Sequence, residues 1–330
     1  MSVEGGTKAI VAALVANLGI AASKFVAFAF TGSTSMASEG VHSLADSGNQ
    51  LLLLVGGRRA QRAADEEHPF GYGRSRYVYA FIVSIVLFSI GGLFAVYEGT
   101  HKIVHPEKLH APYWAVGVLG VAIVLEGLSL RTAMGEARPA RGEGNWWQFV
   151  RHAKAPELPV VLLEDTGALL GLVVALLGVT MAVVTDDGRW DGAGSLAIGV
   201  LLVVIAIVLA VEMNSLLIGE AASRSDVAAV RAALEAGDDI VGVIHLRTLH
   251  LGPEELLVAA KIAVMHDDTA RAVATAIDAA ERRVRVAVPI ARVIYLEPDI
   301  LRTAEDAAGD PGEGYPGADE AGADGARRDP

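Results

Sequence analysis

The sequence predicts an all-α domain of six membrane-spanning helices over residues 1–218, followed by a small α+β domain over 219–300 and an acidic tail over 301–330. Three observations support this fold class. The chain of 330 residues is 52% hydrophobic and has a mean hydropathy of +0.42, which is too apolar for a soluble domain of this length. It contains six apolar runs of about 20 residues, the length that crosses a hydrocarbon core. After Ile218 these runs give way to short alternating ones.

The six runs lie at 8–30, 37–57, 77–99, 113–133, 158–184 and 193–216. The first run is too long for the apolar part of a signal peptide and contains Asn17 and Lys24, so we expect it to remain as a mature helix. Arginine and lysine gather in the connections after the second and fourth runs, and the positive-inside rule places both connections in the cytoplasm. We therefore expect a multi-pass protein of the plasma membrane with both termini in the cytoplasm.

The region after Ile218 predicts a soluble cytoplasmic domain. Ser223 or Ser225 can cap a helix that stops near Gly237. Two strands, a helix and a third strand are then predicted at 241–251, 254–265, 268–285 and 291–297. This αββαβ order is typical of a small sandwich related to the ferredoxin-like arrangement. The tail has eight acids and two bases between 303 and 330 and few apolar residues, so we expect it to be disordered.

The second run carries the residues that most clearly indicate chemistry. At about 100° per helical residue, Glu39, His42, Asp46 and Asn49 fall near one face. Placing an ionisable side chain at membrane depth costs about 2.5–3.5 kcal/mol on insertion scales, so such a group usually faces a partner, a water-filled path or an ion. This face is therefore a candidate cation site. A His–Asp hydrogen bond that ties two helices together is the alternative.

The absence of cysteine narrows the possible metal chemistry. The chain has no cysteine, which excludes disulfides and thiolate ligands and leaves imidazole and carboxylate as the ligands for a transition metal. An enzyme such as an intramembrane metalloprotease is not expected, because no His-Glu-x-x-His sequence is present. A nucleic-acid-binding protein is not expected either, since the basic residues lie beside the membrane runs.

Several motifs together resemble one transporter family. They are Asn17 and Lys24 in the first run, His42-x-x-x-Asp46 in the second, Asp65-x-x-His68-Pro-Phe-Gly-Tyr-Gly-Arg74 before the third, and Leu246-Arg247-Thr248 in the αββαβ domain. From about Lys8 to Pro298 the chain resembles the cation diffusion facilitator family, in the branch that includes animal zinc transporter nine. The resemblance implies a homodimer that exports a divalent metal, most often zinc, from the cytoplasm, usually in exchange for protons.

The resemblance also implies a metal site. Its ligands are His42, Asp46 and Asp165, but Val161 stands where zinc-transporting members carry a second histidine or aspartate. The candidates for the fourth ligand are Glu164, Asn49 and water. Neighbours on a helix point about 100° apart, so Glu164 is expected to reach the site only if the helix rotates or Asp165 turns away.

The expected cargo is Zn²⁺, and no prosthetic group is expected. An oxygen-rich ligand set shifts the preference toward Mn²⁺ or Fe²⁺, and Co²⁺ and Cd²⁺ also stay open. Imidazole and carboxylate must lose protons to bind a metal, so proton loading from the opposite side would help to eject it. The alternative function is a non-transporting membrane scaffold or metal-responsive regulator whose site has degenerated at Val161.

The remaining polar residues are expected to have structural roles. Lys24 should bond to a neighbouring helix or a carboxylate rather than bind metal. Structural or interfacial roles are expected for Glu98, Glu126 and Glu212. Asp65 and His68 correspond to a second metal position in some relatives, but Tyr72 stands where another histidine often falls. The histidines of a soluble-domain zinc site are replaced by Ile244, Lys261 and Tyr295, so this domain should chiefly serve dimerisation.

Overall fold

The computed structural model describes residues 6–31, 34–106 and 112–300. The chain divides into two compact units near Gly219: a helical unit that also includes residues 252–254, and a second unit that begins at Glu220. The acidic tail predicted at 301–330 lies outside the described residues.

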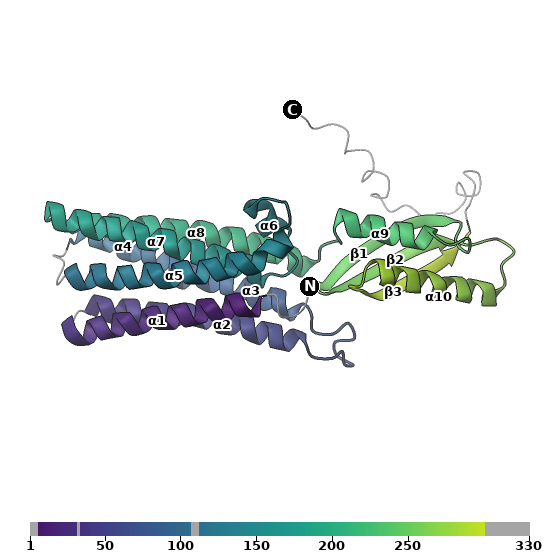
Figure 1. Cartoon of the computed structure of the whole chain (residues 1–330), viewed down its shortest axis with the longest axis horizontal. Helices are drawn as coiled ribbons and strands as arrows, with labels where there is room; N and C mark the ends of the chain where they lie inside the picture. Colours follow the sequence, from purple (N-terminus) through teal and green to yellow (C-terminus); the bar gives the residue numbers. More distant parts are fainter. Residues whose placement is uncertain (1–5, 32–33, 107–111, 301–330) are drawn as a thin grey trace, which may run out of the picture. The chain divides into compact units, whose positions relative to one another are not determined.

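Long helices that lie side by side build the first unit (Figure 1). They are α1 (Thr7–Thr31), α2 (Thr34–Ala60), α5 (Pro112–Arg141), α7 (Glu157–Thr185) and α8 (Arg189–Ile218). A further helical stretch has three parts, which are α3 (Ser75–Val86), the π-helix η1 (Leu87–Leu93) and α4 (Phe94–Val104). The short helix α6 (Trp146–His152) begins at Asn145, whose side chain accepts a hydrogen bond from the backbone N–H of Gln148.

Within the described ranges, five helices are long and apolar enough to cross a membrane. They cover Thr7–Phe30, Ser75–Val104, Tyr113–Arg141, Glu157–Thr185 and Arg189–Ile218. Their outer surfaces carry exposed apolar side chains such as Val121, Leu177 and Ile207, as expected for helices that face lipid. The prediction of a helical integral membrane domain is confirmed. Helix α2 has a similar length but is more polar, because it contains Glu39, Asp46 and two arginines near its end.

The apolar core of this unit occupies one end of the bundle. We call this the proximal end; it contains the start of α1, α3 and α7 and the end of α2, α5 and α8. Tyr77, Leu158, Leu209 and Met213 are at most 1% exposed there. The opposite, distal end is where α1 is followed by α2, α4 by α5 and α7 by α8. The side chains of the described residues are therefore closely packed at the proximal end.

Helices α4 and α8 pack with their backbones in close approach. A Cβ atom on Gly99 would lie 2.3 Å from the backbone nitrogen of Leu196, and one on Gly199 would lie 2.5 Å from the nitrogen of Val96. Small residues permit this approach in membrane helices, where dispersion contacts rather than the hydrophobic effect favour association. The two helices therefore form a tightly joined pair along one side of the cavity.

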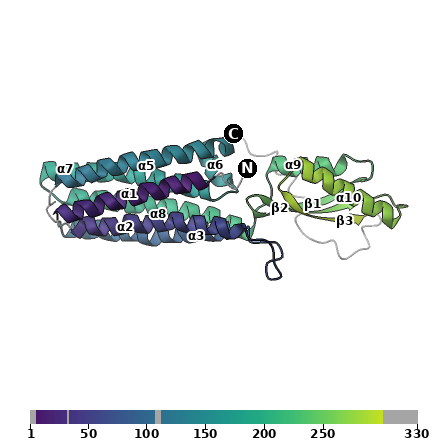
Figure 2. The same cartoon turned by 60° about the horizontal axis from the view of Figure 1, so that its bottom comes forward.

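The second unit contains helices packed on a three-stranded sheet (Figures 1 and 2). Its elements are α9 (Arg224–Glu235), β1 (Gly242–Gly252), β2 (Glu255–Ala263), α10 (Ala270–Ala287) and β3 (Ala291–Asp299). The strand order is β1-β2-β3, and β2 runs parallel to β3 with Val258 opposite Ile294. The Ser223 hydroxyl accepts a hydrogen bond from the N–H of Asp226, so Ser223 rather than Ser225 caps α9. Val230, Leu256, Ile262 and Val284 are fully buried between the helices and the sheet.

Candidate metal site

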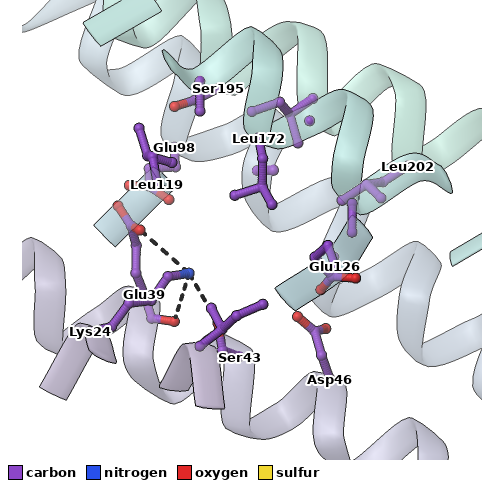
Figure 3. Close-up of a pocket in the computed structure, with 18 of the residues that line it drawn as sticks. Lys24, Glu39, Ser43, Asp46, Glu98, Leu119, Glu126, Leu172, Ser195 and Leu202 are labelled. Atoms are coloured by element: carbon purple, nitrogen blue, oxygen red, sulfur yellow. Dashed lines mark hydrogen bonds and ion pairs between the residues drawn. The ribbon is translucent and has the colours of Figure 1, made fainter. Parts of the chain in front are cut away.

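A cavity of about 270 Å³ lies inside the helical unit. All of its long helices line it, from Asn17 of α1 near the middle of the bundle to Lys102 of α4 and Asp191 of α8 at the distal end. The wall combines apolar side chains with charged ones, and Figure 3 shows Asp46, Glu126, Lys24 and Glu39 around this space. Charged groups inside a membrane bundle usually mark an ion path.

Four carboxylates from three helices gather at the middle of the bundle. Asp46 belongs to α2, Glu126 to α5, and the neighbours Glu164 and Asp165 to α7, and all four line the cavity. Asp46 and Glu126 point toward each other in Figure 3. The charges of Asp46 and Asp165 act on both glutamates, so the four groups are within electrostatic range. The structure therefore brings together three of the carboxylates that the sequence and the resemblance placed at a site, and adds one.

Glu164 is held by two amides of α2. Its Oε1 accepts a hydrogen bond from Asn49 Nδ2 at 3.1 Å, and its Oε2 accepts one from Gln50 Nε2 at 3.0 Å. Asn17 Nδ2 of α1 in turn donates to Gln50 Oε1 at 3.4 Å. This amide chain, made by Asn17, Gln50, Asn49 and Glu164, joins α1, α2 and α7 in the buried interior.

Asp165 is bound on its other side by α5. The Ser129 hydroxyl donates to Asp165 Oδ2 at 2.6 Å, and both residues are 2% exposed. Glu164 and Asp165 are thus both buried without rotation of α7, because one reaches α2 and the other reaches α5. The expectation that Glu164 reaches the metal site only if the helix rotates or Asp165 turns away stays a prediction, because no metal-binding group is assembled among the described side chains.

The metal site is not assembled in the described part of the chain. His42 lies on α2, one turn before Asp46, but its side chain falls outside the described residues. Among the side chains that are described, no three from histidine, cysteine, aspartate and glutamate come together as a metal-binding group. Two of the four carboxylates are instead held by hydrogen bonds to different helices. Asn49 and Gln50 hold Glu164 to α2, and Ser129 holds Asp165 to α5.

Two lysines line the cavity closer to the distal end. Lys24 Nζ donates to Ser43 Oγ at 3.0 Å and lies 3.5 Å from a carboxylate oxygen of Glu39 (Figure 3). Lys102 Nζ lies 3.0 Å from Glu98 Oε1 and 3.1 Å from Asp191 Oδ2. The expectation that Lys24 bonds to a neighbouring helix is confirmed. Both ammonium groups are balanced by nearby acids.

Glu126 and Glu98, for which the sequence predicts structural or interfacial roles, both line the cavity, and Glu98 pairs there with Lys102. Glu126 is 4% exposed and lies opposite Asp46 (Figure 3). No hydrogen bond or ion pair joins it to another residue in the part of the chain that the structure describes. A lone carboxylate in the middle of the apolar run 113–133 is the signal that could have indicated this role.

The connection between α2 and α3 uses its polar residues internally. Tyr72 Oη donates to Asp65 Oδ2 at 2.6 Å, and the His68 backbone N–H donates to Asp65 Oδ1 at 2.8 Å. These contacts, led by the Tyr72 hydroxyl, lower the pKa of the Asp65 carboxyl. The His68 and Tyr72 rings lie 4.3 Å apart between centroids. Asp65 therefore organises this exposed loop through both of its oxygens.

Comparison with known proteins agrees with this geometry. The family model described as the cation efflux transmembrane domain matches residues 10–218. The chain belongs to the cation efflux family. This family comprises transporters rather than enzymes, and all four cavity carboxylates lie within the matched region. The prediction of a cation diffusion facilitator is confirmed.

Individual relatives locate the chain within the cation efflux family. It is 32% identical to the mouse protein named proton-coupled zinc antiporter SLC30A9, mitochondrial, over 231 residues, which cover 69% of this chain and 41% of the relative. The Xenopus laevis protein of the same name is 34% identical over 247 residues, or 74% and 44% of the two chains. Magnetosome protein MamB of Magnetospira is 24% identical over 297 residues, or 87% and 93%. The chain thus spans about two fifths of the length of the SLC30A9 relatives, and it lies near their branch.

Proposed function

We propose that this protein is a secondary active transporter that exports a divalent metal cation, with Zn²⁺ as the first candidate. The observation that carries the proposal is the group of four carboxylates, three of them buried, around the cavity of a cation efflux domain. Several carboxylates with little exposed surface are costly to keep ionised close together, and a divalent cation offsets that cost. The names of the SLC30A9 relatives, which specify zinc and protons, support the choice of cargo.

The proposed ligands are His42, Asp46 and Asp165, with Glu164 as the fourth candidate. One imidazole and several carboxylates suit Zn²⁺ in a tetrahedral site, and a larger share of oxygen would favour Mn²⁺ or Fe²⁺. A transport site has to release its ion, so an incomplete ligand set that assembles only around the cargo suits this role. Asp165 supports this proposal best, since Ser129 already orients its carboxylate toward the cavity wall.

Proton antiport follows from the same ligands. Metal binding displaces protons from imidazole and carboxylate groups, and proton binding displaces the metal. With an inward proton gradient, this exchange moves metal out of the cytoplasm. Flux into vesicles that did not respond to an imposed pH gradient would refute the antiport part of the proposal while leaving metal transport intact.

The proposed topology has six membrane spans, with α2 as the polar sixth and both termini in the cytoplasm. Arg58 and Arg59 at the end of α2 and Arg138 and Arg141 at the end of α5 favour a cytoplasmic proximal end. We propose that residues 219–300 form a ferredoxin-like cytoplasmic dimerisation domain of a homodimer. The proposed location is the plasma membrane, whereas the names of the SLC30A9 relatives include the word mitochondrial. Microscopy of a tagged full-length chain would distinguish these two membranes.

Reconstituted transport tests this function. The wild type, Asp46→Ala, Asp165→Ala and a control, Glu212→Gln, would be compared in proteoliposomes for uptake of Zn²⁺, Mn²⁺, Fe²⁺, Co²⁺ and Cd²⁺. Glu212 is also a buried glutamate, but it pairs with Arg151 and does not line the cavity. We expect both aspartate variants to lose flux and the control to retain it. Absence of flux for every ion in folded wild-type protein would favour the scaffold or regulator alternative, which the missing ligand at Val161 also suggests.

A further inference from the structure

We propose that Glu126 of α5, rather than Glu164, supplies the carboxylate that completes the metal site. The inference rests on the proposed function, because it assigns a ligand to the same site. It also names a residue outside the motifs that carry the family resemblance. Three observations support it: the bonding of Glu164, the position of Glu126 and the organisation of α5.

Glu164 already has a hydrogen-bond donor on each carboxylate oxygen. Asn49 and Gln50 supply these donors, and the two amides are 2% and 0% exposed. Moving Glu164 onto a metal would remove the acceptor from two buried amide groups at once. Unsatisfied polar groups in such surroundings are costly, so the contacts hold Glu164 in place as a link between α2 and α7.

Glu126, unlike Glu164, has no hydrogen-bond donor for its carboxylate among the described residues. It is 4% exposed and lines the cavity, yet no described residue forms a hydrogen bond or ion pair with its side chain. Lys24 forms its hydrogen bonds and ion pair with Ser43 and Glu39, and its ammonium charge acts on Glu126 only at longer range. A buried carboxylate without a hydrogen-bond donor or a direct ion-pair partner is costly to ionise, and a bound cation offsets that cost, so Glu126 gains by binding a cation.

Helix α5 places Glu126 beside the other proposed ligands. Glu126 points toward Asp46 across the cavity in Figure 3, and the charges of Asp46 and Asp165 both act on it. Ser129 lies almost one turn further along the same helix and donates to Asp165. The helix thus presents one carboxylate directly and orients a second through a hydroxyl group.

This ligand set determines which cations the site prefers. The site is dominated by oxygen ligands, because Asp46, Glu126 and Asp165 supply carboxylates and only His42 supplies a nitrogen. Val161 offers no second nitrogen ligand. Such a site is expected to discriminate less strongly for Zn²⁺ over Mn²⁺ and Fe²⁺ than a site with two imidazoles. Glu126 is therefore both a ligand and a determinant of metal selectivity.

Direct metal binding tests the inference without depending on transport. The full chain in lipid nanodiscs would be titrated with Co²⁺, whose visible absorption reports the coordination geometry. Glu126→Gln removes the charge at nearly constant volume, Glu164→Gln makes the same change at the neighbouring candidate, and Glu212→Gln is the matched buried control outside the cavity. Thermal unfolding of each variant shows that it is folded.

We expect Glu126→Gln to weaken Co²⁺ binding by at least about tenfold and to change the absorption spectrum. Loss of a residue that only hydrogen-bonds to a metal ligand already weakens binding by about 10–100-fold, so loss of a ligand should have at least this effect. Glu212→Gln should keep the wild-type spectrum, and Glu164→Gln should weaken Co²⁺ binding much less than Glu126→Gln does. If Glu126→Gln does not fold, Glu126→Asp keeps the charge on a shorter side chain and should still weaken binding and alter the spectrum.

Two contrary results are distinguishable. If the wild type binds Co²⁺ and Glu126→Gln binds it equally well while Glu164→Gln does not, the assignment to Glu126 is overturned and the proposed function stands. If the folded wild type binds neither Co²⁺ nor Zn²⁺, the proposed function and the assignment fail together.

Discussion

Replacing Ser129 by alanine would test whether the hydroxyl group of α5 prepares Asp165 for metal binding. The Ser129 Oγ to Asp165 Oδ2 distance of 2.6 Å is typical of a strong hydrogen bond to a carboxylate, and both residues are 2% exposed. Alanine leaves the helix intact and removes this donor. Because little water reaches the site, the Asp165 oxygen would lose its partner without a replacement.

The size of the effect follows from these contacts. A hydrogen bond to a charged group contributes about 1.5–3 kcal/mol to the free energy of unfolding. Alanine has a higher helix propensity than serine, which offsets up to about 0.5 kcal/mol. The net loss for Ser129→Ala is then about 1–2.5 kcal/mol. If Asp165 is a metal ligand, loss of its outer partner should also weaken metal binding by about 10–100-fold.

Two measurements check this prediction. Unfolding of the purified protein in detergent micelles gives the stability change, and calorimetric Zn²⁺ titration gives the change in Kd. Ser129→Thr keeps the hydroxyl and should retain more of both properties. Thr132→Ala is the matched control, since the Thr132 hydroxyl donates to the Leu128 carbonyl on an exposed face of the same helix. Stability and Zn²⁺ affinity of Ser129→Ala equal to those of Thr132→Ala would refute the reasoning.

Three further predictions concern other parts of the chain. Arg76→Met should lower the free energy of unfolding by about 3–5 kcal/mol, because it leaves the 3%-exposed Glu157 without its bidentate partner. Adding Glu157→Gln should restore part of this loss. A change below about 1 kcal/mol in denaturant unfolding would contradict a buried ion pair. Gly99→Ala should destabilise the bundle by about 1–3 kcal/mol in the same assay, because the Cβ of the alanine would lie 2.3 Å from a backbone nitrogen of α8. An unchanged stability would exclude this close contact between α4 and α8. The Asp65 carboxyl, whose pKa is lowered chiefly by the Tyr72 hydroxyl, should stabilise the α2–α3 connection at pH values above about 3.9, the pKa of Asp in the unfolded chain, and this stabilisation should be lost as the pH falls through the lower pKa of the folded state. An NMR titration should show a higher Asp65 pKa in Tyr72→Phe than in the wild type. Equal pKa values in the two proteins would show that the Tyr72 hydroxyl does not lower the Asp65 pKa.

The long helices were predictable from the sequence because membrane length and apolarity constrain them strongly. Predicted and observed bounds differ by only a few residues for α1 and α7. The π-helical turn at Leu87–Leu93 was not predictable, since it depends on packing rather than on composition. Helix α5 also continues to Arg141 through Pro139, which the apolar run alone does not indicate. The short helix α6 had a readable signal in Asn145 and Gln148, which form its capping box.

The candidate site was predictable in part. An acid in an apolar run needs a functional or structural reason, which drew attention to Asp46 and, with the family resemblance, to Asp165. The position of Glu126 depends on how α5 packs against α1 and α7, which no local pattern specifies. The burial of Glu164 and Asp165 depends on the amides of α2 and the hydroxyl of α5, which helical geometry alone does not indicate.

The two lysines of the cavity also set the net charge of its distal half. Lys24 pairs with Glu39, and Lys102 pairs with both Glu98 and Asp191, so two ammonium groups face three carboxylates and one negative charge remains there. The carboxylates of α5 and α7 at the middle of the bundle have no such lysine within ion-pair distance among the described residues. A doubly charged ion gains twice the Coulomb attraction of a singly charged one at these deeper carboxylates. The lysines thereby lower the negative charge of the distal half and leave the strongest attraction for a divalent cation at the middle of the bundle.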